Sequence, residues 1–118
     1  MNIKLNEIAN KTVIVSGGKG SMGVMVSNFI NDLDDFDVIG IVDPGENDST
    51  FKNFLISDDL VCDYIFEFAP ASVVNENIKI LVNNDAKLII GSSGVNDESI
   101  KLLKNSENVA FILFNSFV

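Results

Sequence analysis

The 118-residue sequence contains no histidine, no tryptophan and no arginine, so all eight of its cationic side chains are lysines. Seventeen acidic residues bring the formal net charge to −9. A chain of this charge has no basic stripe for the phosphate backbone of a nucleic acid, and we expect no polynucleotide partner. Because no guanidinium fork is available, any anion site must be built from backbone N–H groups, with a lysine at most.

Cysteine and long apolar runs are also scarce. Cys62 is the single cysteine, and without a histidine to activate its thiol we interpret it as a buried hydrophobic residue. The apolar run at residues 109–114 is far shorter than the roughly 20 residues that cross a bilayer, and no basic, apolar leader precedes the first strand. The acids of residues 32–35 lack the spacing of a calcium loop. We expect a cytoplasmic protein with neither a membrane partner nor a metal site.

The sequence does contain a regular alternation of apolar strands and amphipathic helices. Strands are expected at residues 12–16, 37–42, 64–68, 87–90 and 109–114, and helices at about 21–33, 72–83 and 97–105, the last capped by Asn96. This alternation predicts a single α/β domain with a Rossmann-like, doubly wound parallel sheet of about five strands in the order 3-2-1-4-5. Ligands of such sheets bind beyond the carboxyl ends of the strands, here at the switch point between the first and fourth strands.

A glycine-rich loop joins the first expected strand to the first expected helix. The loop consists of Gly17, Gly18, Lys19, Gly20, Ser21, Met22 and Gly23. Glycines at every third position permit a tight turn, leave room for a pyrophosphate and let the helix pack close to the strand. The free N–H groups at the start of the helix would then face the anion, so the loop predicts a phosphate cradle.

An acidic residue, Asp43, ends the second expected strand twenty residues after Gly23. In dinucleotide-binding folds a carboxylate here accepts hydrogen bonds from the hydroxyls of the adenosine ribose and repels a 2′-phosphate. The alternative interpretation is that Asp43, Pro44 and Gly45 only form a turn. Because strand, glycines, helix, second strand and acid occur in the required order, we favour nucleotide binding, with NADH preferred to NADPH.

The first expected helix carries an apolar stripe. Its residues are Met22, Val26, Phe29, Ile30 and Leu33. They recur at intervals of three and four, which places them on one face of a helix. We interpret this stripe as core that packs on the sheet.

Several blocks of the sequence together resemble the nucleotide-binding half of dihydrodipicolinate reductase, a lysine-biosynthesis enzyme that reduces a cyclic dihydrodipicolinate-type substrate with NADH or NADPH. The stretch Val15–Gly23, with its Met-Gly ending, is similar to the family's glycine-rich loop, and Asp43 falls at its acidic ribose position. The strand end Tyr64–Ala69 resembles the family's Asp-Phe-Thr segment, and Gly91–Gly94 its Gly-Thr-Thr-Gly turn, which touches the nicotinamide. The resemblance covers the chain beyond residue 11.

The resemblance implies which residues would bind the cofactor. Besides the glycine-rich loop, they are Asp43, Ala69, Gly91, Ser92, Ser93 and Asn115. The last comes from a segment, residues 114–117, that is similar to the family's Asn-Phe-Ser. The sequence departs from the family pattern at three places: Glu67 replaces an aspartate, Ala69 a hydroxyl residue and Ser21 a basic residue.

In the family, the substrate domain with its His-His pair and catalytic lysine follows this last block, and a tail then returns to finish the nucleotide sheet. The chain has no histidine, so we expect the substrate domain to be absent, residues 1–118 to form the dinucleotide-binding domain alone, and no catalytic residue to be present. An apolar face or sheet edge that the tail leaves uncovered favours a homodimer, or a complex with a separate substrate-domain chain.

Three functions remain open on the sequence. The chain is the cofactor half of a reductase, a module that binds or senses NAD(H) without chemistry, or a coenzyme A-binding domain. Asp43 counts against the third, because its charge would repel the ribose 3′-phosphate of coenzyme A. The first two differ only in whether turnover occurs, and the sequence does not decide between them.

Overall fold

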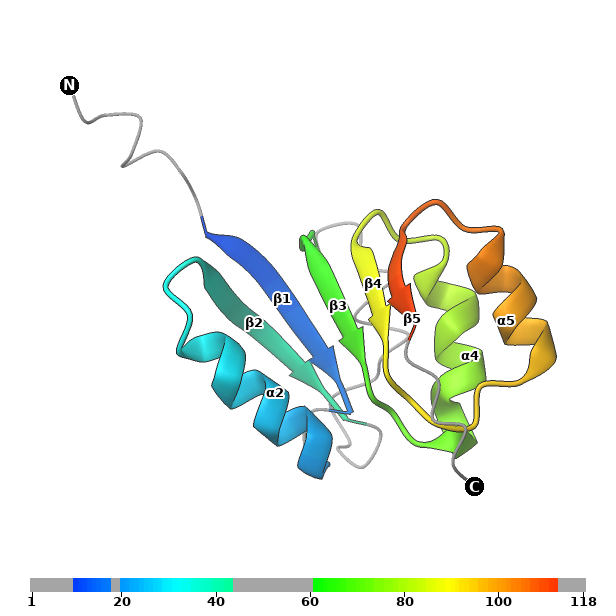
Figure 1. Ribbon diagram of the computed structural model, residues 1–118, viewed down its shortest axis with the longest axis horizontal. Coiled ribbons are helices and arrows are strands. Elements are labelled where there is room, and N and C mark those ends of the chain that lie inside the picture. Colours follow the sequence, from blue (N-terminus) through cyan, green and yellow to red (C-terminus); the bar gives the residue numbers. More distant parts are fainter. Residues whose placement is uncertain (1–9, 18–19, 44–60, 113–118) are drawn as a thin grey trace.

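The computed structural model describes residues 10–17, 20–43 and 61–112 of the chain (Figure 1). Their elements, in chain order, are β1 (Lys11–Ser16), α2 (Ser21–Asn31), β2 (Phe36–Val42), β3 (Tyr64–Glu67), α4 (Ala71–Leu81), β4 (Lys87–Ile90), α5 (Asp97–Lys104) and β5 (Val109–Ile112). Each strand is parallel to its neighbours in the sheet. The predicted α/β fold with a parallel sheet is confirmed.

The order of the strands differs from the predicted 3-2-1-4-5. The sheet runs β2-β1-β3-β4-β5, so the third strand pairs with β1 rather than lying outside β2. The reason is burial. In β3, Ile65 and Glu67 are fully buried, as suits a central strand, whereas β2 leaves Ile39 and Ile41 nearly half exposed and suits an edge. The switch point therefore lies between β1 and β3, not between the first and fourth strands.

The helices lie close to their predicted positions. Helices α2 and α4 end two residues earlier than the periodicity suggested. The predicted cap of α5 is confirmed, since the Asn96 side chain accepts a hydrogen bond of 2.8 Å from the Ser99 N–H. Helix α5 begins here because the Asn96 side-chain oxygen accepts from an N–H of the first turn, for which the helix has no backbone acceptor.

The helices cover the two faces of the sheet (Figure 1). One core cluster joins the sheet to α4 and α5, around side chains such as Ile14, Ile65 and Leu103. A smaller cluster joins Val13 and Val15 of β1 to Ile30 of α2. Cys62 belongs to the larger cluster, and burial, with the nearby Asp63 charge, raises the pKa of its thiol to about 11. The interpretation of this cysteine as a buried hydrophobic residue is confirmed.

The apolar stripe of α2 is only partly core, and this prediction was wrong for most of its residues. Of the stripe only Ile30 is buried, together with Gly23 and Ser27, whereas Phe29 is 66% exposed and Met22 50%. Two small residues on the sheet-facing side turn the larger side chains toward the helix flank. Val26, Phe29 and Leu33 border an apolar groove of about 410 Å³. Its other walls include Tyr64, Phe66 and Ile89.

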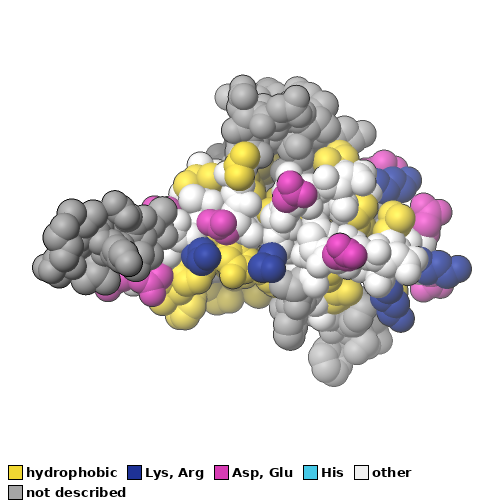
Figure 2. Space-filling model, turned by 90° about the horizontal axis from the view of Figure 1, so that it is seen from above, with side chains coloured by type: hydrophobic (Ala, Val, Ile, Leu, Met, Phe, Trp, Pro, Cys, Tyr) yellow, Lys and Arg dark blue, Asp and Glu magenta, His cyan; other side chains and the backbone are white. Residues whose placement is uncertain are grey.

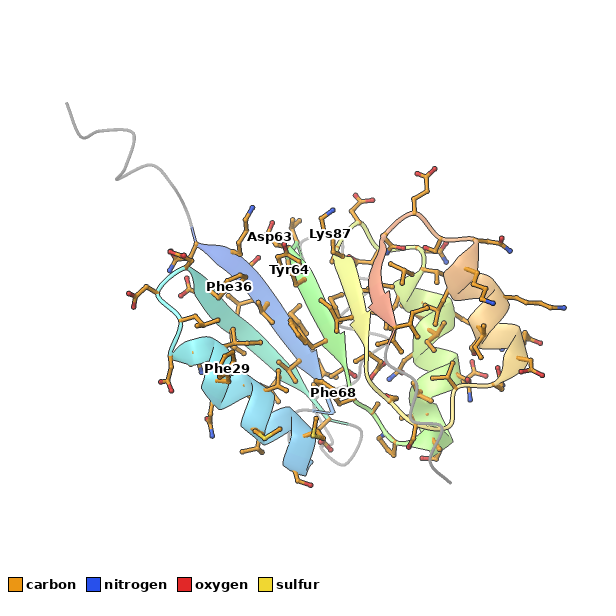
Figure 3. All side chains as sticks on the ribbon, viewed as in Figure 1. Phe29, Phe36, Asp63, Tyr64, Phe68 and Lys87 are labelled. Atoms are coloured by element: carbon orange, nitrogen blue, oxygen red, sulfur yellow. The ribbon has the colours of Figure 1, made fainter. Side chains whose placement is uncertain are left out.

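Polar contacts order the edge at which the strands begin. The Thr12 N–H donates a hydrogen bond of 2.8 Å to Asp63 Oδ2, and this bond lowers the pKa of that carboxyl. In return the Asp63 N–H donates to Thr12 Oγ1 at 3.0 Å. Asp63 and Lys87 lie along this edge in Figure 3, and Figure 2, which looks onto it, shows lysines and acids interspersed. The bonds fix β1 against β3.

Glu67, at the opposite end of β3, is a fully buried acid. Its Oε1 accepts a hydrogen bond of 2.7 Å from the Ala69 N–H, but within the described part of the chain Oε2 has no partner of normal geometry, and neither does Ser16 Oγ beside it. Burial raises the pKa of the Glu67 carboxyl, and the Ala69 N–H and the Ser16 and Asn77 side chains offset this in part.

No helix among the described residues has the length and hydrophobicity needed to span a bilayer. Within the same ranges, no cluster of three or more histidine, cysteine or acidic side chains is arranged to hold a metal ion.

A raised pKa in the folded state makes ionisation of Glu67 oppose folding. The protein keeps this part of its stability below the ordinary pKa of 4.5 and loses it as the pH rises through the folded-state value. We expect Glu67→Gln to be more stable than the wild type at pH 8, by on the order of 1–3 kcal/mol. The difference should shrink toward pH 5. Urea unfolding at both pH values measures it, with the exposed Glu107→Gln as control. A gain independent of pH would contradict the assignment.

Candidate functional site

The carboxyl end of β1 passes unusually close to the chain leaving β3. Gly17 follows β1 with a φ of 75°, in the left-handed region that favours glycine. A Cβ atom there would lie 2.6 Å from the Phe68 carbonyl carbon and 2.7 Å from the Ala69 nitrogen. The Phe68 N–H donates to the Ser16 carbonyl at 2.8 Å. Only glycine fits this position without moving the backbone.

The start of α2 carries no acidic or capping side chain among the described residues. Gly20 is its N-cap residue and supplies no side-chain acceptor, and the first turn of the helix carries no acid. Within residues 10–17, 20–43 and 61–112, a Cβ added at Gly20 would meet only the Gly17 carbonyl oxygen, at 3.5 Å. Ser21 and Met22 are exposed, while Gly23 is buried against the sheet as expected. No described side chain caps the N–H groups at this positive end of the helix dipole, which is the arrangement that suits an anion.

Asp43 follows β2 at the point where this strand meets Gly17. The Gly17 N–H donates a hydrogen bond of 2.7 Å to the carbonyl of Val42, the residue before Asp43. Asp43 itself is half-buried. The parallel pairing of β1 and β2 therefore brings the predicted phosphate cradle and the predicted ribose ligand to the same corner of the sheet.

The backbone N–H and carbonyl of Ala69, in the turn that follows β3, both form hydrogen bonds within the protein. It is buried, its N–H donates to Glu67 Oε1, and its carbonyl accepts a bond of 2.7 Å from Ser92 Oγ. Phe68, before it, lies between the two glycine turns: its backbone is against Gly17 and its ring would lie 2.3 Å from a Cβ at Gly91. Figure 3 shows Phe68 at this end of the strands.

The turn after β4, Gly91–Gly94, is fixed to the turn after β3. The Gly91 N–H donates to the Glu67 carbonyl at 2.9 Å. Ser92 is buried and its hydroxyl lies 2.7 Å from the Ala69 carbonyl oxygen and 3.2 Å from that of Glu67. This serine therefore holds the turn, whereas Ser93 is exposed at the edge. Ser93 is the turn residue whose side chain is free to meet a ligand.

The predicted site residues thus fall into three groups. Those that converge on the carboxyl edge of the sheet are Gly17, Gly20, Ser21, Met22, Gly23, Asp43, Gly91 and Ser93. Ala69 and Ser92 lie at the same edge, but both are buried and form hydrogen bonds within the protein. Gly18, Lys19 and Asn115 lie outside the described residues.

Sequence reasoning missed two residues of this edge. Phe68 lies between the two glycine turns. Its place in the segment that resembles Asp-Phe-Thr was the signal that could have identified it. Asn75, on α4, donates a hydrogen bond of 3.1 Å to the Gly94 carbonyl. No sequence pattern marks an asparagine inside a helix as the partner of a turn nineteen residues away.

Comparison with known proteins agrees with this geometry. A family model described as "Dihydrodipicolinate reductase, N-terminus" matches residues 11–117. The 4-hydroxy-tetrahydrodipicolinate reductase of Lactobacillus helveticus is 26% identical over 91% of the chain, and that of Streptococcus pneumoniae strain P1031 is 30% identical over 78%. The chain covers 46% and 38% of these two proteins.

A solved structure has the same fold. The dipicolinate-bound dihydrodipicolinate reductase from Paenisporosarcina sp. TG-14 superimposes with a TM-score of 0.64 at 15% identity, over 80% of this chain and 43% of that protein. The chain thus spans less than half of each of these relatives. The family model, however, matches nearly all of the described residues. The chain belongs to the dihydrodipicolinate reductase family and corresponds to its N-terminal part.

Proposed function

We propose that this chain binds NADH at the carboxyl edge of its sheet and serves as the cofactor half of a dihydrodipicolinate-type reductase. The observation that carries the proposal is the corner formed by Gly17, the N-terminus of α2, which has no side-chain cap, and Asp43. The N–H groups of the first helical turn suit a diphosphate, and a carboxylate one residue beyond Val42 suits the adjoining ribose diol.

The charge of the chain favours NADH over NADPH. A 2′-phosphate on the adenosine ribose would lie against the Asp43 carboxylate. Asp43 is partly buried, and two negative charges in contact at such a site repel each other strongly. The sequence has no arginine to offset it. The coenzyme A alternative meets the same objection, since its ribose also carries a phosphate.

The described residues supply a place for the cofactor rather than a full catalytic centre. A bound nicotinamide would supply the hydride, while the acceptor must be held and protonated by other groups. The chain contains no histidine. The carboxyl of the buried Glu67 accepts a hydrogen bond from the Ala69 N–H and so serves the fold. We infer that the groups that hold the acceptor belong to a polypeptide segment other than the described residues.

A calorimetric titration tests the ribose assignment. The wild type should bind NADH more tightly than NADPH or coenzyme A, and Asp43→Ala should weaken NADH binding by more than about tenfold, the effect of losing charge-assisted hydrogen bonds. The same change should narrow the preference for NADH over NADPH, because the repulsion is removed. Equal NADH affinity of the two proteins would rule out the assignment.

Substitution of Gly20 tests the phosphate cradle without disturbing the fold. Its backbone adopts a φ of −74°, open to any residue, and among the described residues a Cβ there meets only one oxygen, at 3.5 Å. Gly20→Ala should therefore lower the unfolding temperature by no more than about 5 °C, the small cost of replacing glycine by alanine at an N-cap. It should bind NADH at least about fivefold more weakly, because the methyl group projects toward the diphosphate. Gly17→Ala should instead lose stability, by about 1–3 kcal/mol. Unchanged NADH affinity in Gly20→Ala would show that no diphosphate lies there.

The exposed apolar surface of α2 supports self-association. Phe29 is 66% exposed and Met25 57%, beside the groove that α2 forms with β3 and β4. We propose that a second copy of the chain covers this surface. Light scattering should give twice the mass of 12.8 kDa, and Phe29→Glu should yield a monomer. The matched control is Asn28→Glu, which adds the same charge to a neighbouring exposed position of α2. A monomeric wild type at high concentration would contradict self-association.

A further inference from the structure

The position of the Gly91–Gly94 turn defines which part of a bound dinucleotide it would meet. The turn follows β4, two strands from β1, whereas Asp43 follows β2 on the other side of β1. A dinucleotide with its adenosine ribose at Asp43 and its diphosphate at α2 extends across the ends of β1 and β3 toward β4. The turn after β4 then receives the nicotinamide-bearing half. This step rests on the proposed function.

The turn itself has little intrinsic rigidity. It contains two glycines, and Gly94 has a φ of 82°, with both Ser93 and Gly94 exposed. The start of the turn is fixed by Ser92, whose hydroxyl is 2.7 Å from the Ala69 carbonyl oxygen. The end of the turn depends on contacts from outside it, because glycine can adopt many other backbone conformations at low cost.

Asn75 of α4 provides those contacts. Its Nδ2 donates to the Gly94 carbonyl at 3.1 Å, and its Oδ1 accepts from the Asn96 N–H at 3.0 Å. A single side chain therefore bridges the last residue of the turn and the N-cap residue of α5. Since α4 is anchored in the core through Val74 and Ile78, the bridge ties the turn to a rigid element.

The orientation of the Asn75 amide is itself fixed. The Ser99 hydroxyl, in a buried residue, donates a 2.7 Å hydrogen bond to Asn75 Oδ1, and the Ser99 N–H donates to Asn96 Oδ1 at 2.8 Å. The Asn96 N–H can only donate and the Gly94 carbonyl can only accept, so the reverse orientation of the amide would break both of these bonds. The end of the turn and the start of α5 thus share one closed network.

We propose that Asn75 is the positioning residue for the turn that receives the nicotinamide-bearing half, and so sets how strongly the chain prefers a complete dinucleotide to its adenosine half. Asn75 does not touch the ligand. It acts by keeping the Gly94 carbonyl, and with it Ser93, in one place. Loss of this bridge should weaken the nicotinamide contacts and leave the diphosphate and ribose contacts, built by β1, α2 and β2, intact.

Calorimetry with two ligands separates these effects. NADH is compared with ADP-ribose, which lacks only the nicotinamide. Asn75→Ala should weaken NADH binding about five- to tenfold, the loss expected for about one hydrogen bond's contribution, with ADP-ribose affinity unchanged. Asn75→Asp keeps the acceptor for Asn96 and Ser99 but sets a carboxylate oxygen against the Gly94 carbonyl, so it should show the same selective loss.

The matched control is Asn83→Ala. Asn83 follows α4 at its opposite end and donates one hydrogen bond, of 3.2 Å, to the Lys79 carbonyl, so its loss should leave both affinities unchanged. Ser99→Ala removes one of the two donors to Asn75 and should give a smaller shift in the same direction. Should Asn75→Ala fail to fold, Asn75→Asp and Ser99→Ala still decide the question.

The outcomes distinguish this inference from the function on which it rests. If the wild type binds NADH but the Asn75 variants keep the wild-type ratio of the two affinities, the positioning role is overturned. An equal loss for NADH and ADP-ribose, together with a lower unfolding temperature, would overturn it too, since that is the mark of a purely structural residue. A wild type that binds neither ligand would overturn the proposed function, and this inference with it.

Discussion

The close approach of Gly17 to the Phe68–Ala69 peptide is the constraint on which the rest of this molecule depends. A side chain at Gly17 would lie 2.6 Å from a backbone carbon, so β1 and β3 could not finish side by side. Their parallel pairing, from Val13 with Tyr64 to Ser16 with Glu67, places Gly17 against the residues that follow β3. The Gly17 N–H also bonds the Val42 carbonyl, which keeps the end of β1 beside Asp43.

Below this contact the carboxyl edge is supported by polar groups inside the protein rather than by the sheet alone. The Glu67 carboxyl accepts a hydrogen bond from the Ala69 N–H, and the buried Ser92 hydroxyl lies within hydrogen-bond distance of the carbonyls of both residues. Buried polar networks of this kind restrict a site to one conformation, because each broken bond leaves a group without water to replace its partner. The order of this edge requires the Glu67 carboxyl to be buried, which opposes its ionisation.

The two faces of the sheet differ in how complete they are. On the side of α4 and α5, buried side chains from four strands and two helices form a large core. On the side of α2, a smaller cluster borders an apolar groove that reaches Ile89 of β4. The chain spans less than half of the relatives it resembles, and a face of this kind suits contact with further protein. The domain thus has two separate surfaces: the carboxyl edge of the sheet, proposed to bind the cofactor, and the apolar groove beside α2.

The sequence by itself determined the alternation of elements, the parallel sheet, the Asn96 cap and the grouping of the glycine loop with Asp43, because each depends on local spacing and turn chemistry. The tertiary structure alone decided the place of β3 beside β1, since that depends on which strand can be buried on both faces. It also decided that Phe29 is exposed and that Ser92 and Ala69 support the edge from within. Hydrophobic spacing identifies a helical face but not the neighbour it meets, and a serine beside a glycine gives no sign of whether its hydroxyl will face a ligand or a carbonyl of its own chain.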